Sequence, residues 1–112
     1  MKLITAIIQR KKLDDVTEAL AAKGVGGLTV SDVQGHGTQK GRREIFRGKE
    51  FTVDFLPKTR IDVVIPAEEA EEIIETIASA ARTGEIGDGK IWSTQLSGVV
   101  RVRTGEHGAD AI

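Results

Sequence analysis

Cysteine and tyrosine are both absent from the 112 residues of this chain. The absence of cysteine excludes disulfides, thiol nucleophiles and thiolate metal sites. Histidine occurs only at positions 36 and 107, and neither a Ser/His/Asp pattern nor a His-x-x-x-His spacing is present. The chain is therefore poorly supplied with catalytic side chains, and we expect that it is not an enzyme.

Long apolar runs and an excess of one charge are also lacking. The N-terminal apolar run covers residues 3–8, which is too short for a signal peptide or a membrane span. Lysine and arginine total 16 against 17 acidic residues, and a net charge of −1 argues against bulk binding of nucleic acid. We expect one cytoplasmic domain over residues 1–112, with no nucleic-acid partner, that reaches a membrane only through a partner.

The apolar residues follow strand-like and helix-like patterns in the order β-α-β-β-α-β. The strand-like segments are 2–9, 28–34, 58–65 and 91–103 (one or two strands), and the helix-like segments are 13–23 and 67–81. This order predicts an α+β, ferredoxin-like βαββαβ fold, with an antiparallel sheet and both helices on one face. We expect Ile4, Val63 and Val102, or their neighbours, on the other face, where exposed apolar side chains would indicate an oligomer interface.

The connection from Gly35 to Lys58 is unusually long for a domain of this size, and such connections are commonly functional. Residues 40–60 carry seven cationic side chains against three acidic ones, an excess of four positive charges on a nearly neutral chain. This excess predicts an anionic ligand or partner surface. A solvated loop without a ligand is the alternative.

Three segments are rich in glycine and have a basic residue in or beside them, at 35–41, 84–89 and 104–108. Backbone N–H groups in such segments can bind phosphate. The alternation at 100–103 predicts Arg101 and Arg103 on one face of a strand, where they would either bind a polyphosphate or be solvated. No Walker-type G-x-x-x-x-G-K-[ST] motif is present, so a nucleotide site would be of another kind.

Four sequence blocks resemble the PII signal-transduction family, and together they span most of the chain. They are QGHGTQKG (34–41), DFLPK (54–58), TGEIGDGKIW (83–92) and RVRTGE (101–106). The resemblance implies a homotrimer with ATP/ADP sites between subunits, which senses 2-oxoglutarate beside Mg-ATP. It also implies a T-loop at about 37–55, a B-loop at about 82–90 and a C-loop at about 101–109.

The resemblance implies a role for individual residues. Arg47 would bind the partner, which in this family is often an ammonium transporter. Lys58 would pair with a carboxylate of 2-oxoglutarate, Gln39 would hold Mg²⁺, and Lys40 and Gly41 would complete the effector site. The nucleotide-binding positions would be Thr29, Gly35, Gly37, Thr38, Asp62, Gly87, Asp88, Gly89, Lys90, Arg101 and Arg103.

The chain also departs from the family pattern. Phe51 stands where the family has a modifiable tyrosine, so modification of a tyrosine is chemically impossible here. Thr38 replaces an arginine that reaches a neighbour's phosphates, which puts the preference between ATP and ADP in question. A divergent sensor that keeps the nucleotide cleft but senses another small anion is the alternative. An enzyme acting on phosphate esters is disfavoured because the sequence has no nucleophile–base pair. A nucleic-acid module is disfavoured because the aromatic residues do not have the spacing of a strand face.

Overall fold

The structure is a computed structural model that describes residues 1–36, 43–46, 49–52 and 55–112. Its main sheet is four-stranded, in the order β2-β5-β1-β6, and every neighbouring pair is antiparallel. The strands are β1 (Lys2–Ile8), β2 (Thr29–Gly35), β5 (Leu56–Ile65) and β6 (Lys90–Gln95). The arrangement confirms the predicted ferredoxin-like βαββαβ plan.

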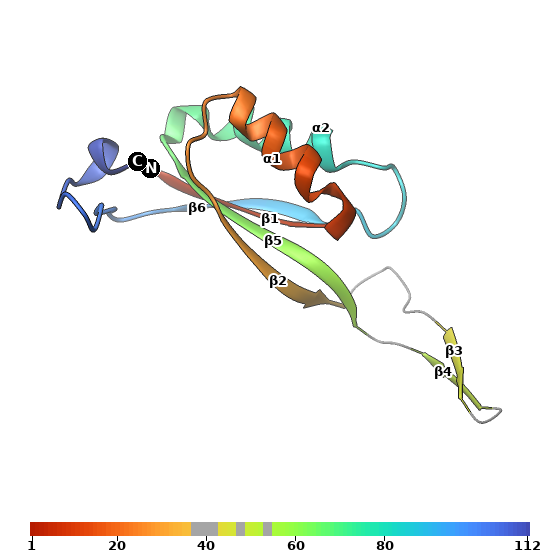
Figure 1. The fold of residues 1–112 in the computed structure, drawn as a ribbon. Coiled ribbons are helices and arrows are strands. Elements are labelled where there is room, and N and C mark those ends of the chain that lie inside the picture. Colours follow the sequence, from red (N-terminus) through yellow and green to blue (C-terminus); the bar gives the residue numbers. More distant parts are fainter. Residues whose placement is uncertain (37–42, 47–48, 53–54) are drawn as a thin grey trace.

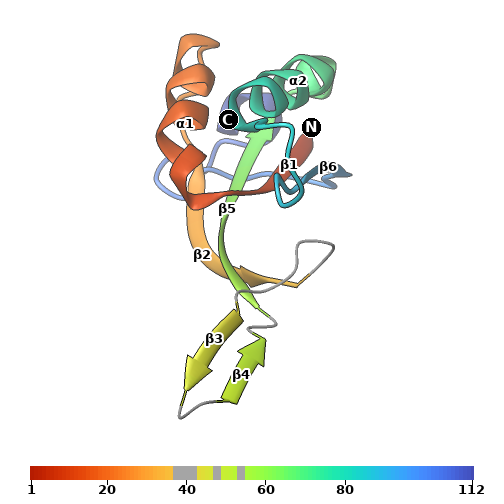
Figure 2. The same cartoon turned by 90° about the vertical axis from the view of Figure 1, so that its right-hand side faces the viewer.

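Two amphipathic helices, α1 (Leu13–Ala22) and α2 (Ala70–Ala81), cover one face of this sheet (Figures 1 and 2). Each follows a short 3-10 turn, η1 (Arg10–Lys12) or η2 (Ala67–Glu69), so Pro66 lies just before the helical segment and not at its first position. Within the described ranges, no helix is long and apolar enough to cross a membrane. The core lies between helices and sheet and contains Ile4, Ala6, Ile8, Val16, Leu20, Ile61, Val63, Ile65, Ala70, Ile73, Ile77 and Ala81.

On the uncovered face of the sheet, the structure places sequence neighbours of the residues that the prediction named first. Ile4 and Val63 pair across β1 and β5 and are buried beneath the helices. The opposite face carries Leu3 and Val64, their sequence neighbours. A shift of one residue turns a strand over, and because β1 is apolar at nearly every position its sequence does not distinguish the two faces.

The strand β5 begins at Leu56, two residues before its predicted start. It includes Pro57, which pairs with Gln34 of β2. Pairing of β5 with β1 ends at Ile8 and Thr59, so Pro57 has a strand partner on one side only. The missing N–H of Pro57 is tolerated at such a half-paired position.

Two further segments differ from the prediction. The long connection contains a hairpin of β3 (Arg43–Phe46) and β4 (Lys49–Thr52), a separate two-stranded sheet, and Phe51 lies in β4. The second is the chain after β6, where Val100 makes a single bridge to His107 and residues 102–104 form a turn. Arg101 and Arg103 therefore do not share a strand face.

Candidate anion-binding site

A pocket of about 470 Å³ lies where the loop 82–89 meets the end of β1 and the start of β5. We call it the glycine-loop pocket. It brings together Gly35, Lys58, Gly87, Asp88, Gly89 and Lys90, six of the residues predicted from sequence. They come from three separate segments of the chain, and the fold makes them neighbours. Ile7, His36, Leu56, Glu85 and Trp92 complete the lining.

Lys58 is the central cation of the glycine-loop pocket. Its side chain is buried, and its ammonium donates a hydrogen bond of 2.7 Å to the carbonyl oxygen of Gly87. A buried ammonium retains its charge only where such acceptors surround it. Lys58 thus links β5 to the glycine loop and carries positive charge into the pocket, as a carboxylate or phosphate ligand requires.

Two glycines allow the backbone segments to approach closely around this pocket. A Cβ on Gly89, which has φ = +101°, would lie 1.7 Å from the carbonyl oxygen of Ile7. A Cβ on Gly35 would lie 3.1 Å from Cγ of Lys58. The first contact excludes any side chain, because both atoms involved are fixed by the backbone. The glycine loop therefore packs directly on the end of β1.

Asp88 lines the same pocket, but its carboxylate binds the loop. It accepts hydrogen bonds from the N–H groups of Thr83 and Gly84, both at 2.8 Å, from the Thr83 hydroxyl, and from the Gln9 side-chain amide at 3.2 Å. The Thr83 hydroxyl and N–H lower the pKa of Asp88, with smaller contributions from Gly84 and the charge of Lys11. The structure favours a positioning role for Asp88 over contact with the ligand.

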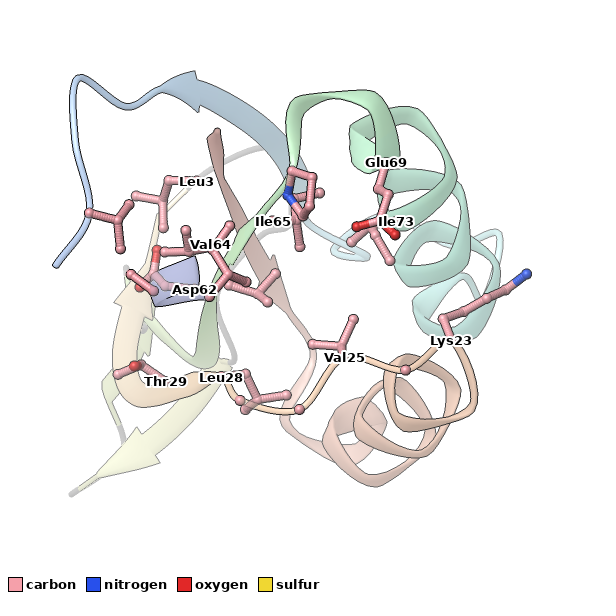
Figure 3. Close-up of a pocket in the computed structure, with 18 of the residues that line it drawn as sticks. Leu3, Lys23, Val25, Leu28, Thr29, Asp62, Val64, Ile65, Glu69 and Ile73 are labelled. Carbon is pink, nitrogen blue, oxygen red and sulfur yellow. The ribbon is translucent and has the colours of Figure 1, made fainter. Parts of the chain in front are cut away.

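A larger pocket of about 740 Å³ lies at the opposite end of the sheet. We call it the tail pocket, because Val99, Arg101, Ala111 and Ile112 of the C-terminal segment line it. Figure 3 shows Thr29, Asp62 and Leu28 at one end of it and Lys23 and Glu69 at the other. Three predicted nucleotide residues, Thr29, Asp62 and Arg101, thus share a pocket whose other residues are largely apolar.

The carboxylate of Asp62 is held by its neighbours on the open face of the sheet. Oδ1 accepts from the Thr5 hydroxyl at 2.7 Å, and Oδ2 accepts from Nε of Arg60 at 2.9 Å. The hydrogen bond from Arg60 is the main reason that the pKa of Asp62 is lowered, although partial burial opposes it. Asp62 remains ionised at neutral pH and orders this part of the sheet.

Arg101 is also engaged within the tail. Its guanidinium donates to the carbonyl oxygen of Ile112 at 3.0 Å and to Oε1 of Glu106 at 3.4 Å. Its backbone N–H bonds to the Glu106 carbonyl, and its carbonyl accepts from Gly105, which closes the turn. Arg103 lies on this turn with an exposed side chain. A phosphate that binds Arg101 must compete with Glu106.

The remaining predicted residues are Gly37, Thr38, Gln39, Lys40, Gly41 and Arg47, which lie outside the described residues. The sequence analysis did not identify the residues that orient Asp88, Asp62 and Arg101. Thr83 and Gln9 hold Asp88, Arg60 and Thr5 hold Asp62, and Glu106 holds Arg101. The Thr-Gly-x-x-x-Asp spacing at 83–88 was the one signal in the sequence, because a threonine and an aspartate so placed commonly close a turn.

The family model described as Nitrogen regulatory protein P-II matches residues 1–106. The chain belongs to the nitrogen regulatory protein P-II family. It is 54% identical to Nitrogen regulatory protein P-II 1 of Methanothermobacter thermautotrophicus over 112 residues, which is all of this chain and 97% of the relative.

Two further relatives have similar identity. Nitrogen regulatory protein P-II of Rhizobium meliloti is 54% identical over the full length of both chains. Nitrogen regulatory protein GlnK of Escherichia coli is 53% identical over 106 residues, 95% of each chain. As a P-II protein, this chain is a nitrogen-regulatory signal transducer, of a class that acts through partner proteins.

Proposed function

We propose that this P-II protein binds ATP or ADP between subunits of a homotrimer, senses 2-oxoglutarate, and regulates an ammonium transporter through residues 37–55. The observation that carries the proposal is the glycine-loop pocket, in which Lys58 and Lys90 meet Gly35, Gly87 and Gly89. Backbone N–H groups of a glycine-rich loop beside two lysines suit an oligophosphate and a small dicarboxylate. The protein is proposed to act as a binding protein and not as an enzyme.

The separation of the two pockets supports a site shared between subunits. Ile7 lines the glycine-loop pocket and Leu3 lines the tail pocket, so the pockets are about four strand residues, or ~13 Å, apart along β1. Lys90 and Arg101 of one chain therefore do not reach adjacent phosphates. In a cyclic trimer, the glycine-loop pocket of one subunit would face the tail pocket of its neighbour and complete the site.

Magnesium would enter with the nucleotide. No group of three acidic or histidine side chains that could hold a metal occurs among the residues that the structure describes. The proposed protein donor is Gln39, outside the described ranges, and the phosphate oxygens and the 2-oxo acid would supply the other oxygen ligands that Mg²⁺ prefers. Lys58 would pair with the distal carboxylate of 2-oxoglutarate, so the two ligands would bind with positive coupling.

Partner binding is assigned to the segment 37–55. Arg47 would contact the transporter. Because position 51 is a phenylalanine, ligand binding would control the segment without modification of a tyrosine there. Ligand binding at the base of a segment can shift it between conformations when it binds one of them more tightly. Gly35 and Lys58, which flank the segment, line the glycine-loop pocket and would transmit such a bias.

Isothermal titration tests this proposal. Mg-ATP is titrated into the protein with and without saturating 2-oxoglutarate, and ADP is titrated under the same conditions. Tighter binding of Mg-ATP, but not of ADP, in the presence of 2-oxoglutarate is expected. Nucleotide binding without a response to 2-oxoglutarate would favour a sensor of another small anion. Absence of nucleotide binding would overturn the proposal.

A further inference from the structure

The loop between α2 and β6 is closed by a single carboxylate. Oδ2 of Asp88 accepts the backbone N–H groups of both Thr83 and Gly84. Oδ1 accepts the Thr83 hydroxyl and the side-chain amide of Gln9. Three of these four donors belong to the loop, and the fourth lies just beyond the last residue of β1. We call this arrangement the Asp88 clasp.

The clasp lies beside the backbone groups proposed to bind the ligand. Asp88 is flanked by Gly87 and Gly89, which have φ angles of +102° and +101°. The Gly87 carbonyl accepts the hydrogen bond of Lys58, and Gly89 packs on the carbonyl of Ile7. Glycine itself restricts the backbone very little, so the peptide groups on both sides of Asp88 are oriented by contacts: the fixed Asp88 side chain between them, the Lys58 hydrogen bond to Gly87 and the packing of Gly89 on Ile7.

The charge of Asp88 would be unfavourable if it faced the ligand. A free carboxylate in a pocket lined by Lys58 and Lys90 would repel phosphate and compete for both ammonium groups. Four neutral donors instead engage both of its oxygens, so the acceptor sites of the carboxylate are occupied within the clasp.

We propose that Asp88 is a positioning residue that holds the loop 82–89 in its anion-binding shape and keeps Gly87 against Lys58, without touching the ligand. The identity of the ligand rests on the proposed function, whereas the positioning role of Asp88 rests on the contacts within the loop. Opening of the clasp would leave only a fraction of molecules competent to bind, and the apparent dissociation constant rises by the inverse of that fraction. A loop that is correctly shaped one-tenth of the time would bind about tenfold more weakly.

The test compares Asp88→Asn with Glu85→Gln. Asparagine has the shape of aspartate, but it is neutral and has only one acceptor oxygen, so it cannot accept all four hydrogen bonds and those that it keeps are no longer charge-assisted. Glu85 lies in the same loop and the same pocket, and none of its side-chain contacts belongs to the clasp, so Glu85→Gln makes the same charge change without opening the clasp. Hydrogen exchange at the Thr83 and Gly84 amides and titration of Mg-ATP and ADP are measured for both variants.

Asp88→Asn is expected to accelerate exchange at both amides about tenfold or more and to weaken both nucleotides by a similar factor, while Glu85→Gln changes neither amide. Unchanged exchange in Asp88→Asn would overturn the inference. So would unchanged nucleotide affinity alongside faster exchange, in a protein whose wild type binds nucleotide. The exchange measurement needs no ligand, so failure of the wild type to bind nucleotide would overturn the proposed function and leave the clasp separately tested.

Two more variants separate positioning from general stability. Thr83→Val removes the hydroxyl donor and keeps the backbone donors, so it should cause a smaller loss of amide protection and of nucleotide affinity than Asp88→Asn. Thr83→Ser keeps the hydroxyl and should behave like the wild type. If Asp88 acts through Lys58, then Asp88→Asn should cost less affinity in a Lys58→Ala background than in the wild type. If the affinity losses of Asp88→Asn and Lys58→Ala are fully additive, Asp88 does not act through Lys58. These variants also serve if Asp88→Asn does not fold.

Discussion

The ammonium of Lys58 donates a hydrogen bond of 2.7 Å to the carbonyl oxygen of Gly87, 29 residues away in sequence. This contact joins the strand that follows the segment 37–55 to the glycine loop before β6. In the proposed P-II mechanism, the effector carboxylate and the nucleotide phosphates meet at this junction. The contact therefore indicates where ligand binding and the conformation of the segment 37–55 would be coupled.

Replacing Lys58 with alanine should abolish the effect of 2-oxoglutarate on Mg-ATP binding and largely spare ADP. The variant removes a charged donor, and a charge-assisted hydrogen bond contributes about 1.5–3 kcal/mol, which corresponds to roughly 10- to 150-fold in effector affinity. Titration with each nucleotide, with and without 2-oxoglutarate, measures the effect. Equal losses for 2-oxoglutarate and ADP would show that the role of Lys58 is misassigned.

Gly89→Ala should unfold at a lower temperature and lose nucleotide binding. Its Cβ would lie 1.7 Å from the Ile7 carbonyl oxygen, and the residue would also keep a φ of +101°. Gly84→Ala is the matched control, because Gly84 has a φ of +88° but nothing within 4 Å of a Cβ. The control has only the conformational cost of about 1–2 kcal/mol, so thermal unfolding should show a clearly larger shift for Gly89→Ala. Equal shifts would mean that the close approach to β1 is unimportant.

The fold was largely predictable from sequence, because each helix repeats its apolar residues with a helical period and each strand is bounded by a turn or a helix signal. What failed depends on tertiary contacts. The apolar β1 does not show which of Leu3 and Ile4 faces the helices. The alternation at 100–103 resembles a strand, but the hydrogen bond from the Gly105 N–H to the Arg101 carbonyl oxygen turns the chain there.

The candidate site was predictable only as a set of residues. The sequence motifs identified Lys58, Asp88 and Arg101, but not the groups that orient them. Those groups, such as Gln9 for Asp88, are distant in sequence and have no periodic pattern. The placement of the predicted residues in two separate pockets likewise depends on the pairing of the strands and not on any local signal.

Glu106→Gln should bind nucleotide more tightly than the wild type. Neutralising Glu106 weakens its pair with Arg101, whose Nη1 lies 3.4 Å from Oε1, and makes the guanidinium more available to phosphate. Exposed pairs of this kind contribute about 0.2–1 kcal/mol, so the expected gain is roughly 1.5- to 5-fold. Asp110→Asn removes a carboxylate in the same tail that makes no ion pair with any described residue, and it is the control for net charge. A loss of affinity in Glu106→Gln would contradict the competition.

Acid should destabilise the protein partly through Asp62. Its pKa is lowered from 3.8, chiefly by the hydrogen bond from Arg60. The folded state therefore holds the carboxylate ionised more strongly than the unfolded state does. The resulting stabilisation is present above pH ~4 and is lost as the pH falls through the lowered pKa.

In Asp62→Asn this part of the pH dependence should disappear, with a loss of about 1 kcal/mol in the free energy of unfolding at pH 7. Urea unfolding of both proteins between pH 3 and 7, at ~0.1 M salt, measures it. Parallel curves for variant and wild type over the acid range would contradict the assignment of the titration to Asp62.

The proposed nucleotide site is built from the glycine-loop pocket of one subunit and the tail pocket of another. Lys90→Ala and Arg101→Ala subunits, each expected to bind ATP poorly, are unfolded together, reassembled at equal ratio and titrated with Mg-ATP. If the site lies between subunits of a cyclic assembly, about one-quarter of the sites in the mixture contain both intact residues and bind with wild-type affinity. If the site lies within one subunit, the mixture binds no better than the average of its two parents, which would contradict the account.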